Sequence, residues 1–172
     1  MRKGFQFKAL AFFVFALLVS TVTFAQQKPI ASPRDSVSAT VAGSKITINY
    51  GSPSVKGRKV FGELEPYGKV WRAGANEATV FTTSKDIMVE GKKLPAGTYG
   101  LFAIPTATTW TIIFNKVAKQ WGAFKYDESS DALRVVVKPV ASAMNERLVY
   151  KITAKGFSLS WDKLSVPVSI KK

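Results

Sequence analysis

The stretch LSVPVSI, residues 164–170, decides the fold of this chain. Every second position in it is apolar: Leu164, Val166, Val168 and Ile170. A period of two residues is typical of a strand with one buried face. Pro167 has no N–H to donate, and proline is tolerated in strands that have a free edge. The stretch therefore predicts a strand at a sheet edge, with its apolar side chains turned toward a core.

The same period of two recurs from Val37 onward, and no segment of ten or more residues shows a helical apolar stripe. About ten short strands separated by short turns favour two antiparallel sheets packed face to face. We therefore expect an all-β protein: a single-domain antiparallel β-sandwich, of immunoglobulin-like or jelly-roll type, over residues 36–172. A closed barrel is the alternative, and the proline in the last strand argues for an open edge instead. The inward positions of the alternating strands place Trp110 and Trp161 in the core.

Two connections are longer than the two to six residues, roughly, that a sandwich turn needs. The first spans residues 51–77 and the second spans residues 115–130. The first is rich in apolar side chains, so we expect it to pack against the sandwich, with a helical turn around residues 59–64. Its apolar members are Val55, Val60, Phe61, Leu64, Tyr67, Val70 and Trp71.

The N-terminal residues have the layout of a signal peptide. Three cations precede or flank an apolar run at residues 9–19, and Thr23-Phe24-Ala25 offers a small-residue cleavage site. Cleavage after Ala25 would remove 25 of 172 residues and leave a flexible lead-in at residues 26–35. An uncleaved anchor is the alternative, but the run is short of the roughly 20 residues that span a bilayer. We expect an exported protein, periplasmic or extracellular, without a transmembrane segment after cleavage.

Composition excludes several classes of chemistry. The chain has no histidine and no cysteine, so Ser-His-Asp triads, Cys-His nucleophiles, His-ligated zinc and disulfides are absent. Phosphate-binding glycine motifs are also missing, and we expect no cofactor and no catalytic residue. The net charge of +14 fits a well-solvated surface, or attraction to an anionic envelope polymer or lipid headgroups. Motifs for nucleic-acid binding are missing, so nucleic acid is not an expected partner.

The segment WRAGANE, residues 71–77, gathers groups that bind sugars. Exported β-sandwiches hold sugar rings on aromatic side chains while amides, guanidinium groups and carboxylates contact the hydroxyls. Trp71, Arg72, Asn76 and Glu77 supply these groups, and Trp121 in the second long loop supplies another ring. We predict that these five residues line a ligand site, with an envelope glycan or another anionic surface polymer as partner.

A structural role for the same segment is an open alternative. In that interpretation Trp71 packs beneath the long loop, and Glu77 pairs with Arg72 or Arg58 because a partly buried carboxylate needs a partner. The residues DESSD at 127–131 would then form a solvated turn, rather than a calcium site that lacks the EF-hand glycine and glutamate.

Three functions follow from these observations. The leading hypothesis is an exported, non-catalytic binding or envelope-associated module that has no metal site. The second is a glycan hydrolase, in which two carboxyls face each other across a cleft. Glu77 would be one of them, and the other would be Glu63, Glu65, Asp127 or Asp131. The third is a structural interaction protein that uses an exposed sheet edge.

Three stretches carry a family resemblance: SPSVKGRKVFGELEPYGKVWRAGANEAT at 52–79, VEGKKLPAGTYGLFAIP at 89–105 and TWTIIFN at 109–115. With the closing LSWDKLSVPVSI, they resemble an exported Bacteroidota family known as a domain of unknown function, family 2911. The resemblance extends from about Ser32 over nearly all of the mature chain. It implies a signal peptide and a single β-rich domain, and it implies no activity.

Overall fold

A computed structural model describes residues 30–172, and the predicted signal peptide lies outside the described residues. Residues Ala31–Lys172 form one compact unit. Its elements are β1 (Arg34–Val41), β2 (Ser44–Gly51), β3 (Thr79–Thr83), β4 (Ile87–Val89), β5 (Lys92–Leu94), β6 (Gly97–Pro105), β7 (Trp110–Asn115), the 3₁₀ helix η1 (Glu128–Ser130), β8 (Asp131–Val137), β9 (Val140–Thr153) and β10 (Gly156–Lys171). Because β1 begins at Arg34, the last two residues of the expected lead-in belong to a strand.

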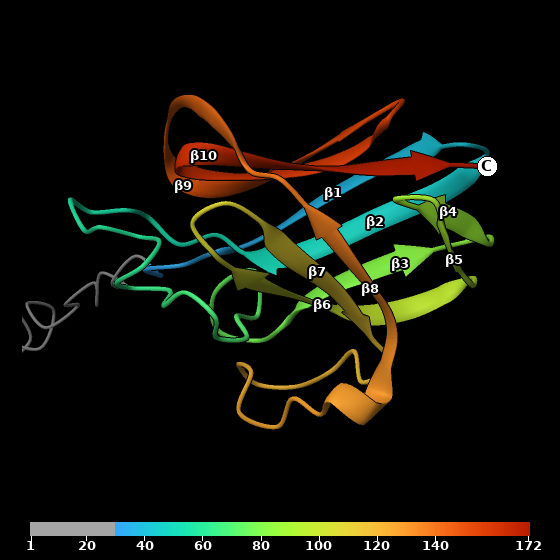
Figure 1. The fold of residues 1–172 in the computed structure, drawn as a ribbon, viewed down its shortest axis with the longest axis horizontal. Helices are drawn as coiled ribbons and strands as arrows, with labels where there is room; N and C mark the ends of the chain where they lie inside the picture. The colour runs from blue at the N-terminus through green and yellow to red at the C-terminus, as the bar shows by residue number, and fades with distance from the viewer. Residues whose placement is uncertain (1–29) are drawn as a thin grey trace, which may run out of the picture. The chain divides into compact units, whose positions relative to one another are not determined.

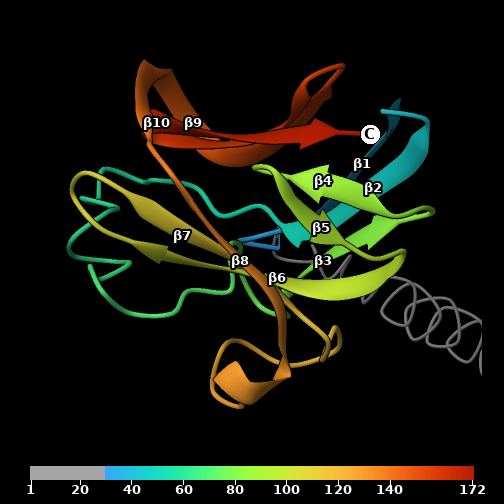
Figure 2. The same ribbon diagram turned by 45° about the vertical axis from the view of Figure 1, so that its right-hand side comes forward.

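Two antiparallel sheets make up this unit. One has six strands in the order β1-β2-β3-β6-β7-β8, and the other has four in the order β5-β4-β10-β9. Figure 1 shows β9 and β10 lying over the six-stranded sheet, and Figure 2 shows β4 and β5 beside them. The sheets do not close into a barrel, so the predicted antiparallel sandwich is confirmed and the barrel alternative is wrong. No helix among residues 30–172 is long and apolar enough to cross a membrane.

Aromatic side chains join the two sheets across the core. Phe81 of β3 packs against Phe157 of β10, with ring centroids 5.6 Å apart. Trp110 of β7 and Trp161 of β10 are almost fully buried, as the alternating pattern predicted. Each large apolar side chain removed from water stabilises the fold by roughly 1.5–3 kcal/mol. The strands therefore hold together through their inward faces, as the period of two residues requires.

The C-terminal strand folds back on itself. Asp162 has a positive φ of 54°, and the register with β9 shifts on both sides of it. Beyond this bend the Ile170 N–H donates to the Lys155 carbonyl at 2.8 Å. A Cβ on Gly156 would lie 2.0 Å from the Val168 carbonyl oxygen, so the close approach of the two halves requires glycine there.

The predicted edge position of residues 164–170 is wrong for the strand as a whole, because β10 lies between β4 and β9. However, β4 pairs with Ile170 and Lys171 alone. Pro167 lies beyond the reach of β4, where no ladder bond requires its N–H. The proline therefore marks a local gap in the sheet and not its outer edge.

The first long loop packs onto the sandwich, as expected. Val55, Val60 and Phe61 are buried, whereas Leu64 and Tyr67 are exposed. The expected helical turn at residues 59–64 is wrong: the chain forms turns there, and Gly62 reverses its direction with a φ of 93°. The loop is thus an ordered part of the domain that lacks regular structure of its own.

Candidate functional site

Trp71 is a core residue. Only 2% of its surface is exposed, and its ring stacks on Trp161 with centroids 5.8 Å apart. Its Nε1 donates to the Gly74 carbonyl at 3.0 Å, and its backbone exchanges two hydrogen bonds of 2.8 Å with Ala103 of β6. The ring is buried in the core, as the structural interpretation of Trp71 expected.

Arg72 lies near Glu65 and not beside Glu77. Burial raises the pKa of Glu65 to about 7, and the positive charges of Arg72 and Arg58 offset only part of that rise. The Nε of Arg72 is buried without a hydrogen-bond partner among the described residues. The guanidinium of Arg58 is used in bonds to the backbone carbonyls of residues 54 and 55. The partly buried carboxylate that the sequence predicted at Glu77 is therefore found at Glu65.

Glu77 pairs with Arg34 at the start of β1. Its Oε2 lies 3.7 Å from the Arg34 Nη1, and both side chains are largely exposed. Such exposed ion pairs contribute about 0–1 kcal/mol. The predicted pairing of Glu77 with Arg72 or Arg58 is wrong, because the Glu77 side chain points to solvent at the rim of the six-stranded sheet.

The second long loop lies directly against residues 76–78. The Ala78 N–H donates to the Gln120 carbonyl at 2.9 Å, and the Gly122 N–H donates to the Asn76 carbonyl at 3.0 Å. Glu77 and Trp121 are partners in an isolated antiparallel bridge between these bonds. Asn76 itself has a positive φ of 64° and donates its side-chain amide to the Ser32 carbonyl. The structure thus places Asn76, Glu77 and Trp121 together, whereas Trp71 lies in the core and Arg72 is half-buried near Glu65.

One face of this second loop covers the outer side of the six-stranded sheet. Ala123 and Tyr126 pack against Phe102 and Ile113, which form a small cluster separate from the main core. The Tyr126 and Phe102 rings are 5.2 Å apart. In Figures 1 and 2 the loop lies on the side of this sheet away from β9 and β10. It is therefore fixed to the sandwich by its own apolar contacts.

The other face of the loop presents aromatic rings to solvent. Trp121 is 62% exposed and Phe124 is 86% exposed. Gly122, which lies between them, has a φ of 65°, and the Phe124 ring packs against its Cα. A Cβ at this position would lie 2.9 Å from the ring. The sequence identified Trp121 as a site residue and missed Phe124, although both lie in the same WGAF motif.

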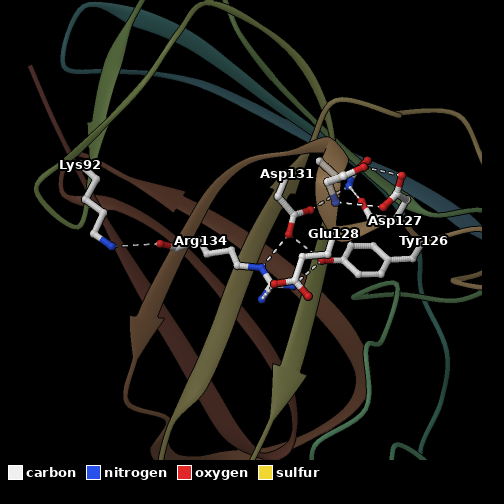
Figure 3. Close-up of polar contacts among 8 residues, drawn as sticks. Lys92, Tyr126, Asp127, Glu128, Asp131 and Arg134 are labelled. Carbon is white, nitrogen blue, oxygen red and sulfur yellow. Dashed lines mark hydrogen bonds and ion pairs between the residues drawn. The ribbon is translucent and has the colours of Figure 1, made fainter.

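A polar clasp centred on Arg134 closes the base of this loop (Figure 3). Arg134 donates to Asp131 and to the Tyr126 hydroxyl at 2.6 Å each, and its Nη1 lies 2.8 Å from Glu128. The Tyr126 hydroxyl donates in turn to Asp131 at 2.6 Å. Asn115 completes the clasp with a 2.8 Å bond to Asp131.

The hydrogen bonds of the clasp shift the pKa values of two of its members. Burial and the bond to Asp131 raise the pKa of Tyr126 to about 12, and the bond to Tyr126 raises the pKa of Arg134 above its ordinary value. The donors and acceptors are used on one another, so the clasp has the character of a structural lock.

The DESSD turn also serves the loop. Both oxygens of Asp127 accept bonds from Ser129, at 2.9 Å from its N–H and 2.6 Å from its hydroxyl. These bonds lower the pKa of Asp127 and cap η1. Within residues 30–172 no three acidic side chains are grouped to hold a metal ion. The capping bonds support the solvated-turn interpretation of this segment.

The carboxylates proposed as partners of Glu77 have contacts elsewhere. Glu63 pairs with Lys59 at 3.1 Å, Asp131 belongs to the clasp, and Asp127 caps η1. The charges that act on Glu65 are those of Arg72 and Arg58, whereas Glu77 pairs with Arg34. Glycoside hydrolysis needs a second carboxyl group that faces Glu77 across a cleft. The contacts of these four carboxylates do not direct any of them toward Glu77.

A separate shallow groove of about 770 Å³ runs along β10 and the end of β8. Its polar lining consists mainly of hydroxyl groups, with Lys138, Lys155 and one carboxylate, Glu90. That carboxylate accepts the Ser169 N–H. None of the predicted site residues lines the groove, so it is distinct from the surface around Trp121.

Comparison with known proteins gives one match. The family model described as "Protein of unknown function (DUF2911)" matches residues 32–170, which is nearly the whole chain. No curated protein and no solved structure matches the sequence. The likeness therefore extends over both sheets and both long loops.

Proposed function

This chain belongs to the DUF2911 family of proteins of unknown function, and from that premise we propose that it is an exported, non-catalytic module that binds a component of the cell envelope. The single observation that carries this proposal is that Trp121 is exposed beside Glu77. Two backbone hydrogen bonds hold its loop against residues 76–78. Groups of exposed apolar side chains mark interaction sites, and Phe124 and Val117 of the same loop are exposed as well. We call the surface formed by residues 76–78 and 116–127 the rim surface.

Order in the rim surface supports binding. Two backbone hydrogen bonds join residues 76–78 to residues 120–122, and the Arg134 clasp closes the base of the loop. A surface that is ordered before it meets its partner loses little conformational entropy on binding. The rim surface also lacks a free pair of carboxyls, which supports a binding role over hydrolysis.

The sequence of the chain supports export. Its first 25 residues have the cations, apolar run and small-residue site of a signal peptide, and the absence of cysteine and histidine is compatible with any compartment. A glycan remains a candidate ligand, because Trp121 supplies a ring and Glu77 and Arg34 supply hydrogen-bonding groups near it.

Co-sedimentation with isolated envelope material tests the proposal. We expect the full chain to bind, Trp121→Ala to lose most of that binding, and Glu77→Gln to change the affinity without ending any turnover. Met144→Ala is the matched control, because Met144 is an exposed apolar residue on β9, outside the rim surface. Release of reducing ends that stops in Glu77→Gln would contradict the non-catalytic role. Equal binding by Trp121→Ala and the unchanged chain would contradict the rim surface.

A further inference from the structure

Three apolar side chains of the second long loop are exposed to solvent. Phe124 is 86% exposed, Trp121 is 62% exposed and Val117 is 45% exposed. Other apolar side chains of the same loop are covered: Ala123 and Tyr126 pack on the outer face of the six-stranded sheet. Exposed apolar side chains gathered on one ordered segment indicate an interaction surface.

The same loop is basic. Lys116, Lys119 and Lys125 are exposed, and no acidic residue occurs from 116 to 126. Within the part of the chain that the structure describes, the ion pairs involve other residues, so these three ammonium groups are not neutralised by a carboxylate. Glu77, the bridge partner of Trp121, is paired with Arg34, and Asp127 at the end of the loop accepts bonds from Ser129. The loop therefore carries both exposed ammonium groups and exposed apolar rings.

We propose that residues 116–127 dock the protein on an anionic lipid bilayer. Trp121 and Phe124 enter the boundary between headgroups and acyl chains, where aromatic side chains are enriched. Lys116, Lys119 and Lys125 contact the anionic headgroups, and each contributes electrostatic attraction near the surface. This inference rests on the proposed function and names the partner of the rim surface.

Phe124 decides between a bilayer and a glycan. A sugar ring that stacks on an aromatic side chain also needs polar groups directed at its hydroxyls. Phe124 is the more exposed of the two rings, and the side chains next to it in sequence are Ala123 and Lys125. A bilayer needs no directed hydrogen bonds to an apolar side chain, and it accepts both rings and the lysines at once.

Fluorescence of Trp121 in the full chain gives a direct test. The other tryptophans, Trp71, Trp110 and Trp161, are buried, and residues 1–29 contain none. The measured change therefore comes from Trp121, the one tryptophan in residues 30–172 that is exposed to solvent. With vesicles of phosphatidylcholine and phosphatidylglycerol, we expect a blue shift of the emission and quenching by brominated acyl chains. Vesicles of phosphatidylcholine alone should give a much weaker response, and salt should reduce the response to the anionic vesicles.

Substitutions separate the contributions of charge and of apolar contact to the affinity for anionic vesicles. The triple variant K116Q/K119Q/K125Q should lower the affinity for anionic vesicles about 100-fold. Phe124→Ala should lower it about 10-fold. Val136→Ala removes an exposed apolar side chain from β8 and should leave the affinity unchanged. Circular dichroism of each variant establishes that the sandwich is folded.

The outcomes separate this inference from the proposed function. An unquenched Trp121 on anionic vesicles, an equal response on both vesicle types, or an unchanged triple variant would each overturn lipid docking. If Trp121 responds to a soluble envelope glycan and not to vesicles, the lipid inference fails while the binding module stands. If envelope material, glycans and vesicles all leave Trp121 unchanged, both proposals fail.

Discussion

Replacement of Glu65 by glutamine should stabilise the protein at neutral and alkaline pH. Glu65 is half-buried near Arg72 and Arg58, and burial raises its pKa from 4.5 to about 7. A carboxyl whose pKa is higher in the folded protein than in the unfolded chain binds its proton more tightly when folded. The folded state therefore has its full stability below pH 4.5 and loses it as the pH rises toward 7. Glutamine resembles the protonated carboxyl and avoids this loss.

The size of the effect follows from the shift. One pKa unit corresponds to 1.36 kcal/mol, so a rise from 4.5 to about 7 sets a ceiling of about 3 kcal/mol. For a domain of this size such a gain would raise Tm by about 6–12 °C. The difference between Glu65→Gln and the unchanged protein should be close to zero at pH 4 and should reach its full value near pH 8.

Urea denaturation of both proteins between pH 4 and pH 8 measures this difference. Glu63→Gln is the matched control, because it removes a negative charge from the same loop at an exposed carboxylate that pairs with Lys59. A difference that does not change with pH would refute the raised pKa. A variant that is less stable than the unchanged protein at pH 8 would show that Arg72 and Arg58 stabilise an ionised Glu65, and the reasoning from burial would be wrong.

Four further outcomes are expected. Acrylamide should quench a single class of tryptophan, and Trp121→Phe should remove that class from a Stern–Volmer plot, because the other three rings are buried. Trp71→Ala should lower the free energy of unfolding by about 3–5 kcal/mol in urea, whereas Trp121→Ala should change it by less than about 1 kcal/mol. Tyr126→Phe removes one hydroxyl from the clasp, so it should lower the free energy of unfolding by about 1–2 kcal/mol and speed amide exchange in residues 116–127. Unchanged exchange would show that the clasp does not hold the loop. Gly156→Ala should lower Tm or prevent folding, because its Cβ would lie 2.0 Å from the Val168 carbonyl oxygen.

Periodicity was sufficient to predict the fold class. The alternation of apolar and polar residues reports which face of a strand is buried, and it predicted an all-β sandwich and the core positions of Trp110 and Trp161. It carries no information on which strands are neighbours. The bend at Asp162 and the insertion of β10 between β4 and β9 depend on contacts between distant residues, so the edge assignment of residues 164–170 failed.

The candidate site was predicted in part, for a physical reason. Trp71 and Trp121 both lie in long loops, and composition alone treats them alike. Trp71 is buried because its backbone pairs with Ala103 of β6, while Trp121 is exposed because its bridge partner Glu77 lies at the sheet rim. Sequence spacing could not show either pairing. The pattern WGAFK at 121–125 did contain the missed residue Phe124, since two rings around a glycine and next to a lysine are unusual in a buried segment.

The pairing of β4 with the last residues of β10 also affects the order of folding. Val89 meets Ile170 across about 80 intervening residues, and loops of this length close slowly. The four-stranded sheet therefore cannot be completed until residues 170 and 171 have been synthesised, whereas all six strands of the other sheet precede residue 138. If the chain is exported as proposed, the four-stranded sheet forms last, after nearly the whole chain has left the ribosome.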